Sequence, residues 1–239
     1  MTILMRLILL LVITFHSSLT IAQSEFSGTI SAIPQSWQQK MIGHSWNPGC
    51  PVELNQLAYL KLSYWGYDQK PHIGILIVHK QVATEVVSIF KILYNHHFPI
   101  YEMKPYDIYP DGEYAKHNDT LGFYCRPAQD NPSEWSSHSY GIAIDINPLV
   151  NPYNDFMTKH AWPIEGSPYL NRDVPMMGMI QPGRIAFNAF THYGWIWGGF
   201  WKKGTDYMHF RKEITNHYIV QHMIYRSNNI NPQIPEHEL

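Results

Sequence analysis

The sequence has little cysteine: Cys50 and Cys125 are the only two thiols among 239 residues. Two thiols are too few for a cysteine-rich zinc knuckle, so a metal site in this chain must use histidine and carboxylate ligands. In an exported protein an even pair of cysteines predicts one disulfide, and two buried free thiols are the alternative. The bond would tie the N-terminal segment to the residues just before Arg126.

The chain also lacks an excess of either charge. Its formal net charge is −2, and no basic stripe runs along any segment. A protein that binds nucleic acid or an anionic membrane surface normally carries such a stripe, so we expect neither partner. Internal repeats and low-complexity tracts are absent as well, which favours one ordinary domain over a repeat array.

Long apolar runs are missing except at the N-terminus. Arg6 is followed by the run of residues 7–15, apolar except for Thr14, and then by polar serines and the small residues Thr20 and Ala22. This pattern predicts a secretory signal peptide over residues 1–22, with an uncleaved anchor as the alternative. We therefore expect a periplasmic or secreted protein that has no membrane span once the signal is removed.

The chain beyond the signal divides by composition into three parts. We expect an N-terminal extension at 23–48, with 23–32 loosely ordered, a main domain at 49–227 and a C-terminal tail at 228–239. Helices are predicted at 34–42, 82–97, 184–194 and 215–226. A hairpin is predicted with strands 57–65 and 72–79, and further strands at 100–104, 122–127, 142–146 and 206–213.

These elements do not alternate in a regular βαβ rhythm, which predicts an α+β fold with a mainly antiparallel sheet and packed helices. Between the last two predicted strands, residues 148–182 form a long excursion punctuated by proline and glycine. Loops of that length in a compact domain are usually functional, and a lid is one interpretation.

The stretch "SSHSYGIAIDINP" at 136–148 has a strand period of two. Its isoleucines, at 142, 144 and 146, fall on one face, and Asp145 falls on the other. A carboxylate inside a strand is costly to bury alone, so its face is either wet or lies against a positive group.

Fourteen histidines are too many to be ligands, but two of them have an aspartate nearby in the sequence. His138 precedes Asp145 by seven positions, and Asp206 precedes His209 by three. Two histidines and one carboxylate make a three-ligand zinc site with one open position, the arrangement of a catalytic zinc. Spacing alone is weak support, because such pairs arise often by chance.

Hydrolysis at such a site needs two further groups. A carboxylate must take a proton from the attacking water and pass it to the leaving amine, and Asp206 is the candidate. A cation must hold the substrate oxygen, and Arg126 is the candidate, with a surface ion-pair member as the alternative reading. Losing such a donor typically costs about 3–4 kcal/mol of barrier.

Aromatic and acidic residues outside these motifs allow two interpretations. The tryptophans Trp135, Trp197 and Trp201 are candidate walls of a cleft or members of the core, whereas Trp195 is expected in the core. The loop carboxylates of Asp107, Asp111 and Asp119 are expected to be solvated.

Three blocks, "WSSHSYGIAIDINPLVNPY", "GWIWGGFW" and "DYMHF", resemble signature blocks of the zinc D-alanyl-D-alanine carboxypeptidase family, which is peptidase family M15 and includes VanY-like enzymes and phage L-alanyl-D-glutamate endopeptidases. The similarity extends back to "PGCPVELNQLAYL" and so covers most of the chain after the signal. The family patterns S-x-H-x-x-G-x-A-x-D and D/E-x-x-H are matched by Ser136, His138, Gly141, Ala143, Asp145, Asp206 and His209. Some relatives have glutamate at the position of Asp206, and Arg211 stands where an acidic or amide residue is frequent.

The resemblance implies that His138, Asp145 and His209 bind one zinc ion, that Asp206 is the general base and that Arg126 stabilises the substrate oxygen. It also implies the hedgehog/DD-peptidase-like α+β fold of the family. The implied activity is hydrolysis of an amide bond in the peptide stem of peptidoglycan, with removal of a terminal D-alanine as the first choice. An L-alanyl-D-glutamate endopeptidase and a non-catalytic cell-wall-binding module on the same fold are the alternatives.

Overall fold

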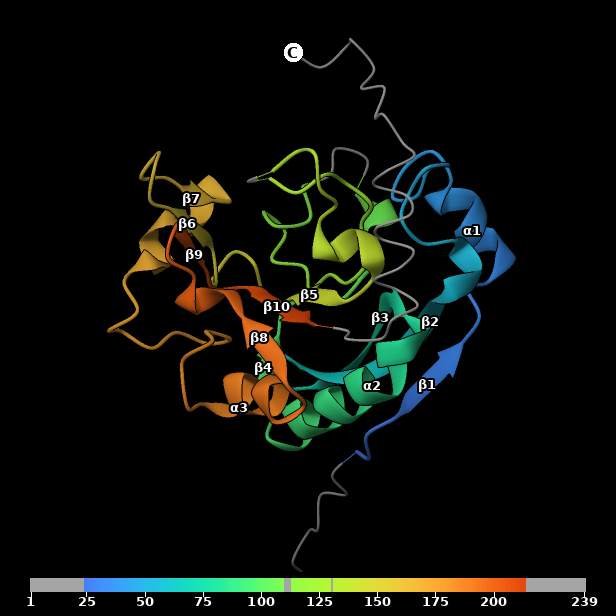
Figure 1. The fold of residues 1–239 in the computed structure, drawn as a ribbon. Helices are drawn as coiled ribbons and strands as arrows, with labels where there is room; N and C mark the ends of the chain where they lie inside the picture. Colours follow the sequence, from blue (N-terminus) through green and yellow to red (C-terminus); the bar gives the residue numbers. More distant parts are fainter. Residues whose placement is uncertain (1–23, 110–112, 130, 214–239) are drawn as a thin grey trace, which may run out of the picture.

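The structure is a computed structural model, and it describes residues 24–109, 113–129 and 131–213 (Figure 1). The predicted signal peptide, the predicted helix at 215–226 and the tail at 228–239 lie outside these residues. The described chain combines helices with three small sheets whose strands pair almost entirely in the antiparallel sense. The predicted α+β class is therefore confirmed.

A long hairpin forms the centre of the largest sheet, as predicted. This sheet contains β1 (Gly28–Ser31), β2 (Leu57–Gly66), β3 (Pro71–His79) and β4 (Pro99–Ile100). Strand β1 lies antiparallel to β2, so the expectation of a loosely ordered segment at 23–32 is wrong. Strand β4 is only two residues long and pairs with β2 in parallel, so the strand predicted at 100–104 does not form as expected.

Three α-helices flank the sheets, close to where the hydrophobic periodicity placed them. They are α1 (Gln35–Met41), α2 (Lys80–Asn95) and α3 (Ile185–His192). Helix α2 lies along the largest sheet, with α3 beside it (Figure 1). The apolar face of α2 is buried in the main core, together with alternate residues of β2 such as Leu60 and Leu62. Burial of this kind stabilises by about 25 cal/mol for each Å² of apolar surface.

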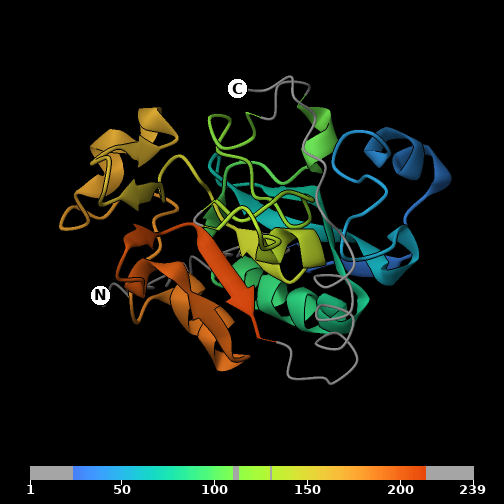
Figure 2. The same ribbon diagram turned by 45° about the horizontal axis from the view of Figure 1, so that its top comes forward.

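Two further sheets complete the fold. The second contains β5 (Ala143–Asp145), β10 (His209–Lys212) and β8 (Trp195–Trp197), in the order β5-β10-β8. The third contains β6 (Tyr153–Asp155), β7 (Ala161–Trp162) and β9 (Gly204–Asp206), in the order β7-β6-β9. Figure 2 shows the third sheet at one side of the molecule, next to β10. The single strand predicted at 206–213 is thus divided between two sheets.

The excursion at 148–182 has secondary structure of its own, because β6 and β7 lie within it. Short 3-10 helices connect the other elements: η1 (Leu54–Gln56), η2 (Tyr106–Ile108), η3 (Ser137–Tyr140), η4 (Ile164–Leu170) and η5 (Gly198–Phe200).

The segment 122–127 makes only isolated contacts, such as the hydrogen bond from Phe123 N to Ile77 O, so the strand predicted there is absent. Among the described residues, no helix has the length and apolar character needed to cross a bilayer.

Cys50 and Cys125 form a disulfide in the structure, with 6.1 Å between their Cα atoms and 75 positions between them in the sequence. The bond fastens the segment before Arg126 to the turn that leads into β2. Arg126 is held further by Ser139, whose Oγ accepts from Arg126 N at 2.8 Å and donates to Arg126 O at 2.7 Å. The backbone on both sides of this arginine is therefore fixed.

Two of the loop carboxylates expected in solvent are buried, so that expectation is wrong for Asp107 and Asp119, while Asp111 lies outside the described residues. The Asp107 side chain is 1% exposed and accepts from Ser45 N and Ser45 Oγ at 3.1 and 2.9 Å. Asp119 is fully buried, and its Oδ1 accepts from Lys104 N at 2.9 Å. Its Oδ2 is also buried but has no hydrogen-bond partner among the described residues.

Replacing Asp119 with asparagine is expected to stabilise the fold at neutral pH. Burial raises the pKa of Asp119 well above its ordinary value, and nearby Glu102 raises it further, against the Lys104 N–H. The unfolded chain therefore loses this proton first, and stability falls as pH rises above about 4. The amide removes that cost, so unfolding in urea should show a gain of about 1 kcal/mol at pH 7 that vanishes near pH 4.

Asp107 provides the matched control, because its two carboxylate oxygens both accept hydrogen bonds from Ser45. Asp107→Asn should lose stability at pH 7. A loss of stability in Asp119→Asn at the same pH would show that the Asp119 carboxylate is satisfied in the folded protein.

Candidate metal centre

His138 is placed by a short turn with defined ends. It lies in η3, where the Ser136 side chain accepts from His138 N at 3.3 Å and caps the turn. Gly141 ends the turn at φ +66°, and a Cβ there would lie 2.6 Å from His79 N, so glycine is required on both counts. The His138 Nδ1 atom lies 2.6 Å from Gly122 O, which can only accept. Nδ1 therefore carries the proton, and Nε2 is left with a lone pair.

Asp145 and His209 are a cross-strand pair. They stand directly opposite each other on β5 and β10, and their exposed fractions are 3% and 5%. The neighbouring residues Ile144 and Phe210 point to the other face and belong to the main core. The alternation of the strand thus fixes both sides: the isoleucines pack inside, and Asp145 faces two histidines.

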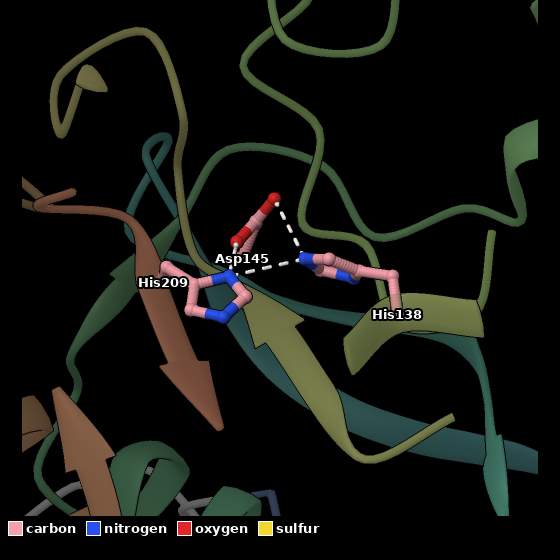
Figure 3. Close-up of side chains that lie close together, drawn as sticks. All are labelled: His138, Asp145 and His209. Carbon is pink, nitrogen blue, oxygen red and sulfur yellow. Dashed lines mark hydrogen bonds and ion pairs between the residues drawn. The ribbon is translucent and has the colours of Figure 1, made fainter. Parts of the chain in front are cut away.

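The three side chains converge on one point (Figure 3). His138 Nε2 lies 3.2 Å from Asp145 Oδ2 and 3.1 Å from His209 Nδ1, and His209 Nδ1 lies 2.9 Å from Asp145 Oδ1. Two ligands of a tetrahedral zinc ion lie about 3.3 Å apart when each bond is about 2.0–2.1 Å long. Among the described residues, this is the group whose histidine and carboxylate atoms could hold a metal ion together.

The arrangement is hard to satisfy without a cation. In its neutral form His138 Nε2 is an acceptor, yet it faces the Oδ2 acceptor of Asp145. Burial raises the pKa of Asp145, but His138 and His209 lower it by more, so that this pKa lies below its ordinary value. Burial lowers the pKa of His209, against the raising effect of Asp145. An ionised carboxylate and imidazole lone pairs in a buried site fit a divalent metal.

Further groups orient the three side chains. Tyr114 donates its hydroxyl proton to Asp145 Oδ2 at 3.0 Å, and the Ser137 hydroxyl lies 3.2 Å from His209 Nε2. With its Nδ1 lone pair turned to the centre, His209 carries its proton on Nε2 and donates to Ser137. Tyr114 was missed by sequence reasoning, because it lies in a polar loop that carries no motif.

Replacing Tyr114 with phenylalanine is expected to weaken metal binding by about 10–100-fold, because Asp145 loses the donor that fixes its Oδ2. Competition with a zinc chelator of known affinity measures the change. Tyr106 belongs to the same buried aromatic cluster and stacks on Tyr124, so Tyr106→Phe is the matched control. Equal weakening in both variants would show that only the packing of the cluster matters.

Asp206 ends β9, three residues before His209. Its Oδ1 is shielded from solvent and has no hydrogen-bond partner among the described residues. Burial raises its pKa well above the ordinary value, Asp145 adds to this, and Arg126 and the Met208 N–H oppose it. A Cβ on Gly198 would lie 2.7 Å from Asp206 O and 3.4 Å from His209 Cβ. The absence of a side chain at Gly198 therefore leaves room for Asp206 and His209 to lie against this segment.

Arg126 is half-buried, and its Nη1 donates to Pro127 O at 3.1 Å. The Arg126 charge acts on the centre, because it lowers the pKa of Asp206. Burial and Asp145 raise that pKa, and their effects are larger. Arg126 also lowers the pKa of His209, although burial, Asp145 and His138 each have a larger effect on it. The structure thus brings the predicted cation near the predicted base and ligands.

The candidate wall residues lie in different surroundings. Trp201 is half-buried with its ring 5.2 Å from that of His209, whereas Trp197 is buried in the main core. Trp135 is half-buried and forms an isolated bridge with Pro127. Sequence reasoning missed Trp162, which is 40% exposed and packs edge-on against Tyr114 at 5.8 Å. Its stretch has no motif that could have singled it out.

Residues 129–212 match a family model described as D-alanyl-D-alanine carboxypeptidase. The resemblance to peptidase family M15 is confirmed over these residues. The matched segment contains the three converging side chains and Asp206, whereas Arg126 and both cysteines precede it. Comparisons with curated proteins and with solved structures gave no match. The match includes all the strands of the second and third sheets.

Proposed function

We propose that this protein is a zinc-dependent peptidase that hydrolyses an amide bond in the peptide stem of peptidoglycan, acting as a D-alanyl-D-alanine carboxypeptidase. The observation that carries the proposal is the convergence of two imidazole nitrogens on the Asp145 carboxylate. His138 Nε2 lies 3.2 Å from Oδ2, His209 Nδ1 lies 2.9 Å from Oδ1, and the two nitrogens lie 3.1 Å apart. The family match over the same residues supports the substrate class.

His138, Asp145 and His209 would hold the metal through the atoms that face one another. Zinc, when bound in such a site, polarises a carbonyl and lowers the pKa of water. Asp206 would accept a proton from the attacking water at Oδ1, the oxygen that has no partner, and would return it to the leaving amine. A carboxyl with a raised pKa is suited to both transfers.

Arg126 would stabilise the negative charge that develops on the substrate oxygen. Its backbone is fixed by the disulfide at the preceding residue and by two hydrogen bonds with Ser139. Trp201 would form a wall of the site beside His209. Preorganised charge of this kind is usually the largest single contribution to catalysis of acyl transfer.

We further propose a periplasmic or secreted location. The disulfide supports it, because such bonds form and persist in oxidising compartments. The predicted signal peptide and the location of the proposed substrate agree with it.

Digestion of purified sacculi and of defined stem peptides tests the activity. We expect zinc-loaded protein to release free D-alanine, detected by mass spectrometry, and chelator-treated protein to release none. A cut between L-alanine and D-glutamate would replace the carboxypeptidase with an endopeptidase on the same residues. Intact stems together with tight binding of sacculi would replace both with a cell-wall-binding module.

A further inference from the structure

A pocket lies beside the segment that connects β8 to β9. Its volume is about 440 Å³, within the usual range for small-ligand sites. The lining combines aromatic rings with two arginines and parts of the excursion: Arg172, Ile180, Gln181, Pro182, Arg184, Trp197, Gly199, Phe200 and Tyr207. None of these residues belongs to the group that converges on the metal position.

The segment that follows β8 joins the pocket to the centre. Gly198 and Trp201 face the centre, since a Cβ at 198 would touch Asp206 and the Trp201 ring lies 5.2 Å from that of His209. Gly199 and Phe200, the two residues between them, line the pocket instead. The centre and the pocket are therefore lined by neighbouring residues of one short segment.

Arg172 brings an uncompensated charge to the pocket. Its Nη1 donates to Val150 O at 2.8 Å and Tyr169 O at 3.2 Å. Its Nη2 donates to Asn151 Oδ1 at 2.9 Å and Ile180 O at 2.7 Å. All four acceptors are neutral, so they satisfy the Nη donors but leave the charge, and the buried Nε has no hydrogen-bond partner among the described residues. The guanidinium lies 4.4 Å from the centre of the Tyr207 ring, and burial lowers the pKa of Arg172 to about 10.

Arg184 adds a second charge at the same pocket. It is exposed and precedes the first turn of α3. Within the ranges that the structure describes, the arginine and lysine ion pairs involve Lys104, Lys116, Arg211 and Lys212 but neither Arg172 nor Arg184. The lining also contains no acidic residue. Two cationic residues therefore line one cavity, and neither forms an ion pair within the part of the chain that the structure describes.

We propose that this pocket binds a carboxylate group of the peptide substrate, with Arg184 as its direct partner and Arg172 as a fixed positive charge behind it. The aromatic walls suit the short apolar part of an amino acid that carries the carboxylate. The proposal rests on the proposed function, because it takes the ligand to be part of the hydrolysed peptide. Arg184 is thus a specificity-determining residue, since an amide in place of the carboxylate leaves the two cations unpaired.

Two carboxylates of a stem peptide share this chemistry: the one at the C-terminal D-alanine and the one on D-glutamate. Binding of matched acid and amide pairs separates them. The probes are acetyl-D-alanyl-D-alanine with its C-terminal amide, and acetyl-L-alanyl-D-glutamate with its fully amidated counterpart. Calorimetry on chelator-treated full-length protein removes the metal as a competing anion site and needs no turnover.

We expect one acid to bind about tenfold more tightly than its amide, because a hydrogen bond to a charged group is stronger than one between neutral groups. Arg184→Gln should abolish that preference, and added salt should reduce it. The control is Lys202→Gln, which removes an equal charge from an exposed residue two positions beyond Phe200 and outside the lining. This control should keep the preference.

Equal affinity for acid and amide in both pairs would overturn the proposal, and so would an unchanged preference in Arg184→Gln. The pair that shows the preference identifies which carboxylate the pocket takes. Failure of the proposed function has a different signature, because the acid preference would then persist in protein that hydrolyses no stem peptide when loaded with zinc.

Discussion

Asp206→Asn is expected to lower kcat by about 10²–10⁴-fold, the range typical of a lost general acid–base group. The amide keeps the size of the side chain but cannot accept the proton that Oδ1 would take. The three residues that converge on the metal position are unchanged, so the variant should still bind one equivalent of zinc. Steady-state hydrolysis of a stem peptide and metal analysis of the same sample measure both quantities.

Asp155→Asn is the matched control for this variant. Asp155 lies on β6, which pairs with β9, but its carboxylate is exposed and accepts from Met157 N at 2.8 Å. This change should leave kcat within a few-fold of the unmodified protein. Full activity in Asp206→Asn would exclude Asp206 as the base, and loss of zinc from it would show that the carboxylate helps to hold the metal.

His209→Ala is expected to abolish stoichiometric zinc binding, and with it activity. The substitution removes one of three ligand atoms and leaves Asp145 facing His138 alone. Zinc affinity should fall by more than the about 10–100-fold expected when a residue that only orients a ligand is removed. It also leaves a buried void beside the β5–β10 pair, so circular dichroism must establish that the variant is folded before its zinc content is compared.

His160→Ala provides the control for His209→Ala. His160 is exposed and lies in the turn between β6 and β7, where removal of an imidazole changes surface only. It should bind zinc with unchanged affinity. Retention of tight, one-to-one zinc binding by a folded His209→Ala variant would require a ligand set other than the one in Figure 3.

Much of the fold could be predicted from short-range patterns in the sequence. The hairpin of β2 and β3, the apolar face of α2 and the inward isoleucines of β5 were all readable from periodicity, because each buries one continuous face. The pairing of β5 with β10 was not readable, since 64 residues separate Asp145 from His209. No local pattern reports a contact of that separation.

The same limit explains what sequence reasoning missed around the site. Tyr114 reaches Asp145 from a polar loop that carries no motif, and Trp162, on β7, packs against Tyr114. The order of the excursion was missed for a similar reason. Buried Asn151 and half-buried Arg172 bind backbone groups from both ends of it, so a stretch rich in proline and glycine is held in place. Hydrogen bonds from side chain to distant backbone leave no periodic trace.

The register that sets His209 opposite Asp145 also orders events during biosynthesis. A ribosome adds His209 after nearly nine tenths of the chain, and 64 positions after Asp145, so a nascent chain holds only two of the three converging residues throughout that interval. The third residue arrives only when β10 docks on β5. Binding of the proposed metal ion by all three residues would therefore follow pairing of β10 with β5, and its uptake would report a late step of folding.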